Sequence, residues 1–369
     1  MSTMRAARMH NLHEPFAVDE LDVPEPRPTD VLVRVKACGV VPNLGNVLNH
    51  LPEWWPHLTF PPRPAIFGLD VAGEIAAVGE QVHGLSIGQR VYVNPGRQCG
   101  GCTACRVGDP QHCPAYTFNG YFGFGPESAK IFADYPYAGM AEYMTAPQSS
   151  IVTIPDNLPF ETAARFGYLG TAYRALRLAG ANANSVVAVN GASGTLGVCL
   201  VLIARSLGVR KILAIARNAG LLAEVKTLDP QRIETFAHDE SSDVTDWIFA
   251  NSGGRGADIV VDALQSGTPA EPLLETFDGL ARGGTHLPIG GVLGPLPINL
   301  NVLMSNDRRI IGSLWFDVAD GQAMADMVES GSLDVSCFEH ETFRLDQVNE
   351  ALAVIENRHG GFSNYVITP

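Results

Sequence analysis

The stretch from Val186 to Arg217 constrains the fold of this chain more than any other. It begins with a short apolar β-branched run, Val186–Val189, which predicts a strand. A glycine-containing turn follows and opens into Val198–Leu207, an apolar segment with helical periodicity. The order strand, glycine turn, helix is typical of a loop that binds phosphate groups.

Small residues recur in this turn with the spacing of a dinucleotide-binding motif, at Ala192, Gly194 and Gly197. They allow the backbone to approach a pyrophosphate, whose charge is stabilised by the free amides at the start of the helix. A lone glycine pattern is a weak signal, but a second apolar run, Lys211–Ala216, follows the helix as a dinucleotide fold requires. The residues predicted to hold the cofactor here are Gly191, Ala192, Ser193, Gly194, Thr195, Leu196 and Gly197.

The end of the second run predicts which dinucleotide binds. An acidic residue there would accept hydrogen bonds from the adenosine 2′-hydroxyl and select NAD. This chain has Ala216 instead, followed by Arg217 and Asn218. A guanidinium without a neighbouring carboxylate favours a 2′-phosphate. We therefore predict that Arg217 and Asn218 bind NADP(H), although an isolated arginine at a strand end is by default a solvated surface charge.

Length and composition indicate a globular protein of two domains. The 369 residues are 46% hydrophobic and 17% charged, which is enough for two cores. A formal charge of −14 without a basic run argues against nucleic acid or an anionic membrane surface as a partner. Neither a signal peptide nor a stretch of transmembrane length is visible, so a cytoplasmic location is expected.

Four of the seven cysteines lie close together, at Cys99, Cys102, Cys105 and Cys113. Four thiolates within a short glycine-containing loop suit tetrahedral coordination of one zinc ion. The alternative is a pair of local disulfides, which an intracellular chain disfavours. Because four thiolates leave zinc no open position, the metal is predicted to be structural.

The rest of the chain falls into two kinds of sequence. Short β-like runs punctuated by proline and glycine occupy the first part, and strands alternating with helices follow the nucleotide turn, which implies a parallel doubly wound sheet. A helix is expected over 160–179, a late strand over 309–316 and an amphipathic helix over 345–357. An aromatic, glycine-rich run between 116 and 137 either covers a core or forms the wall of a binding pocket.

Together these features resemble the zinc-containing alcohol dehydrogenase relatives of the medium-chain dehydrogenase/reductase superfamily. The motifs that carry the resemblance are Val35–Val40, Gly68–Gly79, the cysteine lobe, the nucleotide turn and Thr171–Tyr173. The resemblance implies an α/β protein with a GroES-like β-barrel-type catalytic domain (1–155, with the zinc lobe at 99–113), a Rossmann domain (156–314) and a return to the catalytic domain (315–369). Thr171, Gly290 and Leu314 are also predicted to contact the cofactor.

The chain departs from the family pattern at the ligands of the catalytic zinc. Such enzymes hold a second, catalytic zinc in the cleft through cysteine and histidine ligands, but the matching positions here are Val41, Leu69 and Gly167. Asp70 alone keeps a carboxylate nearby, and one carboxylate cannot hold catalytic zinc. Without that Lewis acid the cleft is poorly suited to simple alcohols.

The sequence therefore predicts NADPH-dependent reduction of an activated C=C bond, as in an enone or quinone, whose developing charge hydrogen bonds can stabilise. Asn43 matches a proton-relay position of the family, and Tyr168 and Tyr121 are candidate proton donors. The alternatives are an NADP-dependent alcohol or carbonyl dehydrogenase and a non-catalytic NADPH-binding protein. His50 and His57 are candidates for a proton donor or, with Asp70, an unusual metal site, although packing or surface roles are the default for them.

The expected partners are a small unsaturated or carbonyl substrate and further copies of the chain. The family pairs subunits through strands near the end of the Rossmann sheet, and Ile310–Phe316 is apolar enough to do so. The resemblance thus implies a homodimer or homotetramer.

Overall fold

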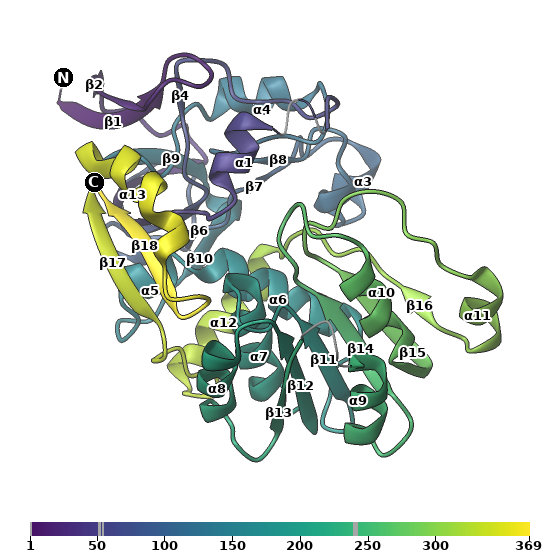
Figure 1. Ribbon diagram of the computed structural model, residues 1–369. Helices are drawn as coiled ribbons and strands as arrows, with labels where there is room; N and C mark the ends of the chain where they lie inside the picture. Colours follow the sequence, from purple (N-terminus) through teal and green to yellow (C-terminus); the bar gives the residue numbers. More distant parts are fainter. Residues whose placement is uncertain (1, 51–52, 54, 239–242) are drawn as a thin grey trace.

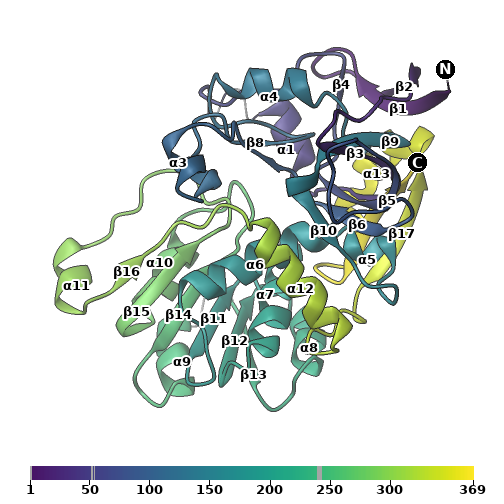
Figure 2. The same cartoon turned by 180° about the vertical axis from the view of Figure 1, so that it is seen from behind.

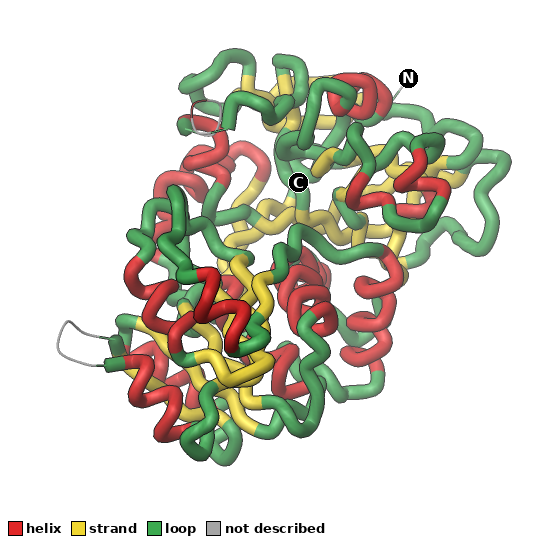
Figure 3. The backbone as a smooth tube through the Cα atoms, turned by 90° about the vertical axis from the view of Figure 1, so that its right-hand side faces the viewer, coloured by secondary structure: helices red, strands yellow, loops and turns green. Residues whose placement is uncertain are grey.

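The computed structural model describes residues 2–50, 53, 55–238 and 243–369. Its elements form a β-rich domain and an α/β domain that lie side by side (Figure 1). Both chain ends lie on the β-rich domain, as the view from behind also shows (Figure 2). In Figure 3 the strands of the two domains form two separate groups, with helices packed around the lower one.

The β-rich domain is built on one mostly antiparallel sheet with the order β10-β6-β5-β3-β18-β17, and β9 pairs with β3 beside this path. The strands are β3 (Asp30–Gly39), β5 (Asp70–Val78), β6 (Arg90–Val93), β9 (Tyr143–Pro147), β10 (Ile151–Thr153), β17 (Glu339–Arg344) and β18 (Ser363–Thr368). Smaller sheets join β1 (Thr3–Met9), β2 (Ala17–Asp22) and β4 (Ala65–Ile66), and β7 (Gly96–Arg97) with β8 (Thr117–Phe118).

The α/β domain contains one parallel sheet with the order β13-β12-β11-β14-β15-β16. Its strands are β11 (Val186–Asn190), β12 (Lys211–Ala216), β13 (Ile233–Ala237), β14 (Ala257–Asp262), β15 (Leu280–Pro288) and β16 (Arg309–Ile310). The direction of strand order changes between β11 and β14. In doubly wound sheets a ligand binds at this change, beyond the carboxyl ends of the strands.

Helices cover both faces of that sheet. The helices between its strands are α7 (Thr195–Ser206), α8 (Ala219–Thr227), α9 (Val244–Asn251), α10 (Glu271–Asp278) and α11 (Leu300–Ser305). Along β11, Val187 and Val189 belong to the core that includes α7, whereas Val186 and Ala188 face the core that includes α9 and α10. This two-sided burial explains why the strand is a continuous apolar run rather than an alternating one.

The end of the chain returns to the β-rich domain. β18 pairs with β3 through Val366 and Ile367, and β17 runs parallel to β18 at the edge of the same sheet. α12 (Val318–Glu329) precedes β17 and β18 in the chain, and α13 (Val348–Val354) connects β17 to β18. The division of the chain at residues 155 and 314 stays a prediction.

The helix expected over 160–179 is wrong as a single element. It is split into α5 (Phe160–Ala163) and α6 (Phe166–Leu178). The break contains Arg165, whose buried guanidinium donates to the carbonyl oxygens of Ser363, at 2.8 Å, and Gly361. Tertiary bonds to the returning tail therefore replace helix continuity at this point.

The strand expected over 309–316 is also wrong beyond its first two residues. After Ile310 the segment leaves the sheet edge and crosses to the β-rich domain. There the ring of Phe316 stacks on Tyr92 with centroids 6.1 Å apart, and the side-chain amide of Asn94 donates to the Phe316 carbonyl at 3.2 Å. Burial of an aromatic side chain between the domains outweighs the local β propensity.

Other expectations differ from the structure in length or kind. The helix expected over 345–357 consists of α13 with a 3₁₀ turn at each end. No helix was expected at α1 (Leu44–Asn49), α3 (Thr103–Arg106), α4 (Ser128–Asp134), α11 or α12. Four of these have seven residues or fewer, which offer little periodicity to detect. α12 has twelve residues and was missed although Asp317 and Asp320 form a capping box at its start.

Candidate functional site

The predicted nucleotide turn joins β11 to α7 at the change of strand order. Gly191 has φ +85°, and a side chain there would crowd the Ala263 carbonyl at 2.9 Å. A Cβ at Gly197 would overlap the Gly191 carbonyl, so this glycine lets the helix pack against the turn. At Gly194 the nearest atom to an added Cβ is 3.3 Å away, which leaves this backbone the most open of the three glycines.

The polar groups of the turn fit a bound phosphate. The Thr195 hydroxyl, at the first residue of α7, is buried and has no hydrogen-bond partner within the protein. No side chain caps the N-terminus of this twelve-residue helix, so its first amides remain available to an anion. From the returning tail, the Gly361 N–H donates to the Ser193 carbonyl at 2.8 Å and holds the turn in place. These groups suit the diphosphate of a dinucleotide.

Arg217 and Asn218 lie where expected, directly after β12. Arg217 is exposed. Asn218 is the N-cap of α8, and its side-chain oxygen accepts from the Leu221 N–H at 3.0 Å. This cap accounts structurally for the asparagine. That Arg217 binds a 2′-phosphate stays a prediction.

The three other predicted cofactor contacts have different surroundings. The Thr171 hydroxyl donates to the Gly167 carbonyl one turn earlier in α6, at 2.8 Å. A Cβ at Gly290 would lie 2.7 Å from the Leu264 backbone nitrogen, so the loops after β14 and β15 approach each other closely there. Leu314 is 43% exposed. Their contact with a cofactor stays a prediction.

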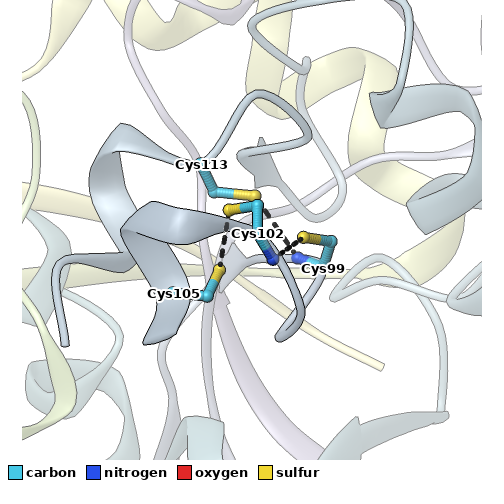
Figure 4. Close-up of side chains that lie close together, drawn as sticks. All are labelled: Cys99, Cys102, Cys105 and Cys113. Atoms are coloured by element: carbon cyan, nitrogen blue, oxygen red, sulfur yellow. Dashed lines mark hydrogen bonds between the residues drawn. The ribbon is translucent and has the colours of Figure 1, made fainter. Parts of the chain in front are cut away.

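The four lobe cysteines converge on one point (Figure 4). Their sulfur atoms all lie within 4.8 Å of one another, and among the described residues they form the one such group of potential metal ligands. Backbone N–H groups of Cys99 and Ala115 donate to the Cys113 sulfur, each at 3.4 Å. Hydrogen bonds from backbone N–H groups also lower the pKa of Cys99 to about 6. The arrangement fits a tetrahedral zinc ion, and the N–H donors favour thiolates as its ligands.

The positions that match the catalytic zinc ligands are apolar or empty of side chain. Val41 and Leu69 line one small, shallow hollow together with Gly39, Leu44, Gly68, Tyr121 and Met140. Tyr121 is the one residue of this lining whose side chain carries a hydroxyl group. His57 is exposed while Asp70 is buried, so the structure does not support the unusual metal site considered above.

Of the three catalytic candidates, Tyr121 and Asn43 are hydrogen-bonded. Burial raises the pKa of Tyr121 well above its ordinary value, and a hydrogen bond from the Asn43 side chain opposes this effect. The Asn43 side-chain oxygen in turn accepts from the Asn46 amide at 2.9 Å.

Tyr168 is the third catalytic candidate. It is partly exposed, lies near the start of α6, and is close enough to Tyr121 and Asp70 to influence their electrostatics. Burial also raises the pKa of Tyr168. Both phenols therefore stay protonated at neutral pH, which makes them better hydrogen-bond donors than proton donors.

Asp70 is the feature of this site that sequence reasoning undervalued. Its side chain is buried, 2.8 Å from the Tyr92 hydroxyl, and burial raises its pKa to about 7 despite hydrogen bonds from Tyr92 and the Gly167 backbone. Asn46 was also missed, although its spacing of three residues from Asn43 at the start of a helix is a local signal. Tyr92 gave no signal, because only the pairing of β5 with β6 brings it near Asp70.

The raised pKa of Asp70 predicts a dependence of stability on pH. Between about pH 4 and about pH 7 the unfolded chain releases this proton first, so stability falls as pH rises, by at most about 1.4 kcal/mol per pH unit. The Asp70→Asn variant lacks this proton. We expect its free energy of unfolding, measured with urea, to rise relative to wild type across that window and to level off above it. A difference in free energy of unfolding between variant and wild type that stays constant over this pH range would contradict the raised pKa of Asp70.

Most of the aromatic run between 116 and 137 covers a core. The rings of Tyr116, Phe118, Phe122 and Phe124 contact one another, and Phe118 also packs on Trp315 with centroids 4.9 Å apart. Tyr121 is the member that lines the hollow. The core alternative is therefore confirmed for those four aromatic residues, and a binding role of Tyr121 stays a prediction.

The β-rich domain with its cysteine lobe and the parallel sheet with its glycine turn together define a two-domain dehydrogenase fold. Comparison with known proteins agrees with this assignment of the fold. The model of the alcohol dehydrogenase GroES-like domain matches residues 27–156, and that of the zinc-binding dehydrogenases matches residues 195–330. The alcohol dehydrogenase of Geobacillus stearothermophilus is 31% identical over 314 residues, covering 84% of this chain and 85% of that protein.

Other relatives match along nearly the full length. The NAD-dependent alcohol dehydrogenase of Sulfurisphaera tokodaii is 27% identical over 365 residues, 96% of this chain and 97% of that protein. A protein from Sinorhizobium meliloti described as a zinc-binding dehydrogenase, solved with NADP bound, superposes with a TM-score of 0.82 at 22% identity and full coverage of both chains.

The chain belongs to the zinc-type alcohol dehydrogenase-like branch of the medium-chain dehydrogenase/reductase superfamily. It is thus an oxidoreductase of that family, with a GroES-like domain and a Rossmann-type sheet, and the predicted fold class is confirmed. None of the described helices has the length and apolar character needed to cross a lipid bilayer.

Proposed function

We propose that this chain is an NADPH-dependent reductase of activated C=C bonds, with an enone or quinone as substrate. The observation that carries the proposal is the hollow between Val41 and Leu69, where an apolar surface and one tyrosine hydroxyl stand in place of metal ligands. Such a surface holds no Lewis acid to polarise a simple carbonyl or to stabilise an alkoxide. A conjugated substrate needs less stabilisation from the protein, because its developing negative charge is spread over several atoms.

NADPH, when bound, supplies a hydride to the β-carbon of the substrate. The chain holds the cofactor through Gly191–Gly197, with the Thr195 hydroxyl and the α7 amides on the phosphates and Arg217 on the 2′-phosphate. The four lobe cysteines would hold a structural zinc ion, which would keep that loop folded. A cytoplasmic location is part of the same proposal.

Tyr121 acts on the substrate oxygen. Asn43, whose side-chain oxygen accepts from the Asn46 amide, lies near Tyr121 and orients its hydroxyl toward the substrate. Tyr168 lies beside it and supplies a second donor for the charge that develops on the conjugated oxygen. Since both phenols hold their protons tightly, we assign them to stabilising an enolate and leave its protonation to solvent.

The test combines zinc analysis with two matched substrates. We expect one zinc per chain, and NADPH consumption with 2-cyclohexen-1-one but not with cyclohexanone. Two zinc ions per chain, or oxidation of plain alcohols, would overturn the proposal. NADPH binding without turnover of enones, quinones or aldehydes would instead indicate a non-catalytic NADPH-binding protein.

An NADP-dependent alcohol or carbonyl dehydrogenase is the second candidate. It is favoured by the relatives, which are named alcohol dehydrogenases. Such an enzyme would use the phenols of Tyr121 and Tyr168 on a C=O group. Equal turnover of the enone and the saturated ketone with one zinc per chain would support it.

Cofactor preference depends on Arg217. Replacing it with alanine is expected to raise KM for NADPH by roughly 10- to 100-fold and leave KM for NADH nearly unchanged, because only the 2′-phosphate contact is lost. Arg210→Ala is the matched control, since this exposed arginine precedes the other end of the same strand, β12. A variant that weakens both cofactors equally, or neither, would show that Arg217 does not read the phosphate.

We also propose that two copies pair at the β16 edge of the α/β sheet. This edge carries exposed apolar side chains: Leu300, Val302, Met304, Ile310 and Leu314. Leu300 is 73% and Met304 74% exposed on α11, which projects from the molecule beside β16 (Figures 1 and 2). Unpaired edges flanked by apolar side chains favour association with another chain.

Charge on this surface should prevent pairing. Met304→Asp is expected to convert the dimer, or a tetramer built from it, into smaller species in analytical ultracentrifugation. Val107→Asp serves as the control, because Val107 is equally exposed, at 73%, but lies in the zinc lobe. If wild type sediments as a monomer, or Met304→Asp leaves its mass unchanged, pairing at this edge is wrong.

A further inference from the structure

Asp70 and Gly167 share one space in the interior. Asp70 is the first residue of β5, and Gly167 is the second residue of α6. The Asp70 side chain, only 1% exposed, reaches the start of the helix, where its carboxyl group lies against the Gly167 backbone and the Gly167 N–H favours the charged form. Arg165 supplies no side-chain cap for this helix. A carboxylate at a helix N-terminus is stabilised by the free N–H groups and the helix dipole.

A side chain at position 167 and the Asp70 carboxyl exclude each other. A Cβ built on Gly167 would overlap Asp70 Oδ1 and lie 2.7 Å from both Oδ2 and Cγ. The backbone of Gly167 is ordinary helix without a positive φ, so glycine is needed here for space and not for conformation. The space beside Gly167, the position predicted to match a metal ligand, is thus filled by a carboxyl group from strand β5.

Asp70 is fixed from its other side as well. The Tyr92 hydroxyl, on β6, donates to Oδ1 at 2.8 Å, and the Tyr92 ring packs against Phe166 with centroids 5.6 Å apart. The charged group Arg165 and the titratable groups Cys38, Tyr121 and Tyr168 also lie near this carboxyl. β5, β6 and the start of α6 therefore meet at one carboxyl group.

We propose that Asp70 is a positioning residue that links β5 to the start of α6 in the place where relatives of this fold would use a metal ion. The link sets the backbone of Gly167, and Tyr168 is the next residue. It thereby holds the Tyr168 phenol beside Tyr121. The inference rests on the proposed function as far as Tyr168 is concerned, whereas the link itself does not depend on any activity.

The link also prevents simple restoration of a second zinc site. A cysteine at 167 would meet the Asp70 carboxyl before its sulfur could face Val41 and Leu69. Replacing the three positions by ligands is therefore not sufficient while Asp70 is present.

Kinetic measurements test the positioning role. We expect Asp70→Ala to lower kcat with the enone roughly 10- to 100-fold, as a small displacement of the donor would, and to leave KM for NADPH within about twofold. Asp70→Asn keeps an oxygen acceptor for the Gly167 N–H and should restore most of kcat. Tyr92→Phe is the control that removes one hydrogen bond from Asp70 but keeps the link to α6. An unchanged kcat in Asp70→Ala, or equal losses in Asp70→Asn and Asp70→Ala, would overturn the role.

A double-mutant cycle tests the link without any activity. Gly167→Ala should lower the urea midpoint strongly in wild type but much less in the Asp70→Ala background, because the overlapping carboxyl is then gone. Additive effects of the two substitutions would show that the residues do not compete for space. If the cycle shows coupling but no enone is reduced, the proposed function fails and the link stands. If the enone is reduced but the cycle is additive, the link fails alone.

Discussion

Purified Cys105→Ser protein is expected to contain less than about one tenth of a zinc ion per chain and to melt about 10 °C or more below wild type. Cys105 is one of four sulfur atoms that lie within 4.8 Å of one another, and removing one ligand leaves three thiolates without a tetrahedral partner. The lobe itself has little else to hold it, since the helix between the ligands, α3, has only four residues and none of them is buried. Elemental analysis and calorimetry measure the two effects.

Cys337→Ser is the control for this experiment, because Cys337 is a free, partly buried cysteine outside the lobe. It should keep one zinc per chain and a melting temperature near that of wild type. Full zinc content in Cys105→Ser would rule out the four-cysteine site. Absence of zinc from wild type, together with loss of free thiols, would favour the pair of local disulfides instead.

The second large effect is expected at Tyr121. Replacing it with phenylalanine should lower kcat for the enone by about 100-fold, the usual cost of losing one donor to a developing oxyanion. The ring remains to fill its place, and KM for NADPH should be unaffected, because the nucleotide turn lies in the other domain. Asn43→Ala should cause a smaller loss, since it removes only the group that orients the phenol.

Tyr116→Phe is the matched control, because Tyr116 is a buried tyrosine of the same aromatic run that does not line the hollow. It should leave kcat unchanged. If Tyr121→Phe also retains kcat within about twofold, Tyr121 is not the principal donor. A large loss in Tyr168→Phe would then transfer that role to Tyr168.

Several parts of the fold and site were predictable because their causes are local. The run Val186–Val189, the glycines after it and the apolar segment that follows lie within one short stretch, and each element has the expected type. The four cysteines are close in sequence, so their convergence required only one loop. The prediction that Val41, Leu69 and Gly167 stand where relatives have metal ligands also rests on local motifs, those of the family.

Other parts were not predictable, because they depend on residues that are far apart in the chain. The segment after Ile310 has the composition of a strand, yet Phe316 leaves the sheet to stack on Tyr92. The break between α5 and α6 follows from bonds between Arg165 and the tail. The local sequence around Phe316 and Arg165 indicates secondary-structure propensity and burial. It does not indicate which distant residues these side chains will contact.

The sequence by itself determined the class of fold, and it predicted the nucleotide turn, the metal lobe and the absence of catalytic zinc ligands, because spacing and residue type act within short segments. Only the tertiary structure decided what lies against Gly167, one of the positions predicted to lack a ligand. Pairing of β5 with β6 and packing of α6 against them place the Asp70 carboxyl in the space left free by Gly167. The partners of a buried carboxyl group come from segments that are far apart in the sequence and meet only when the domain folds. A local sequence pattern therefore cannot predict them.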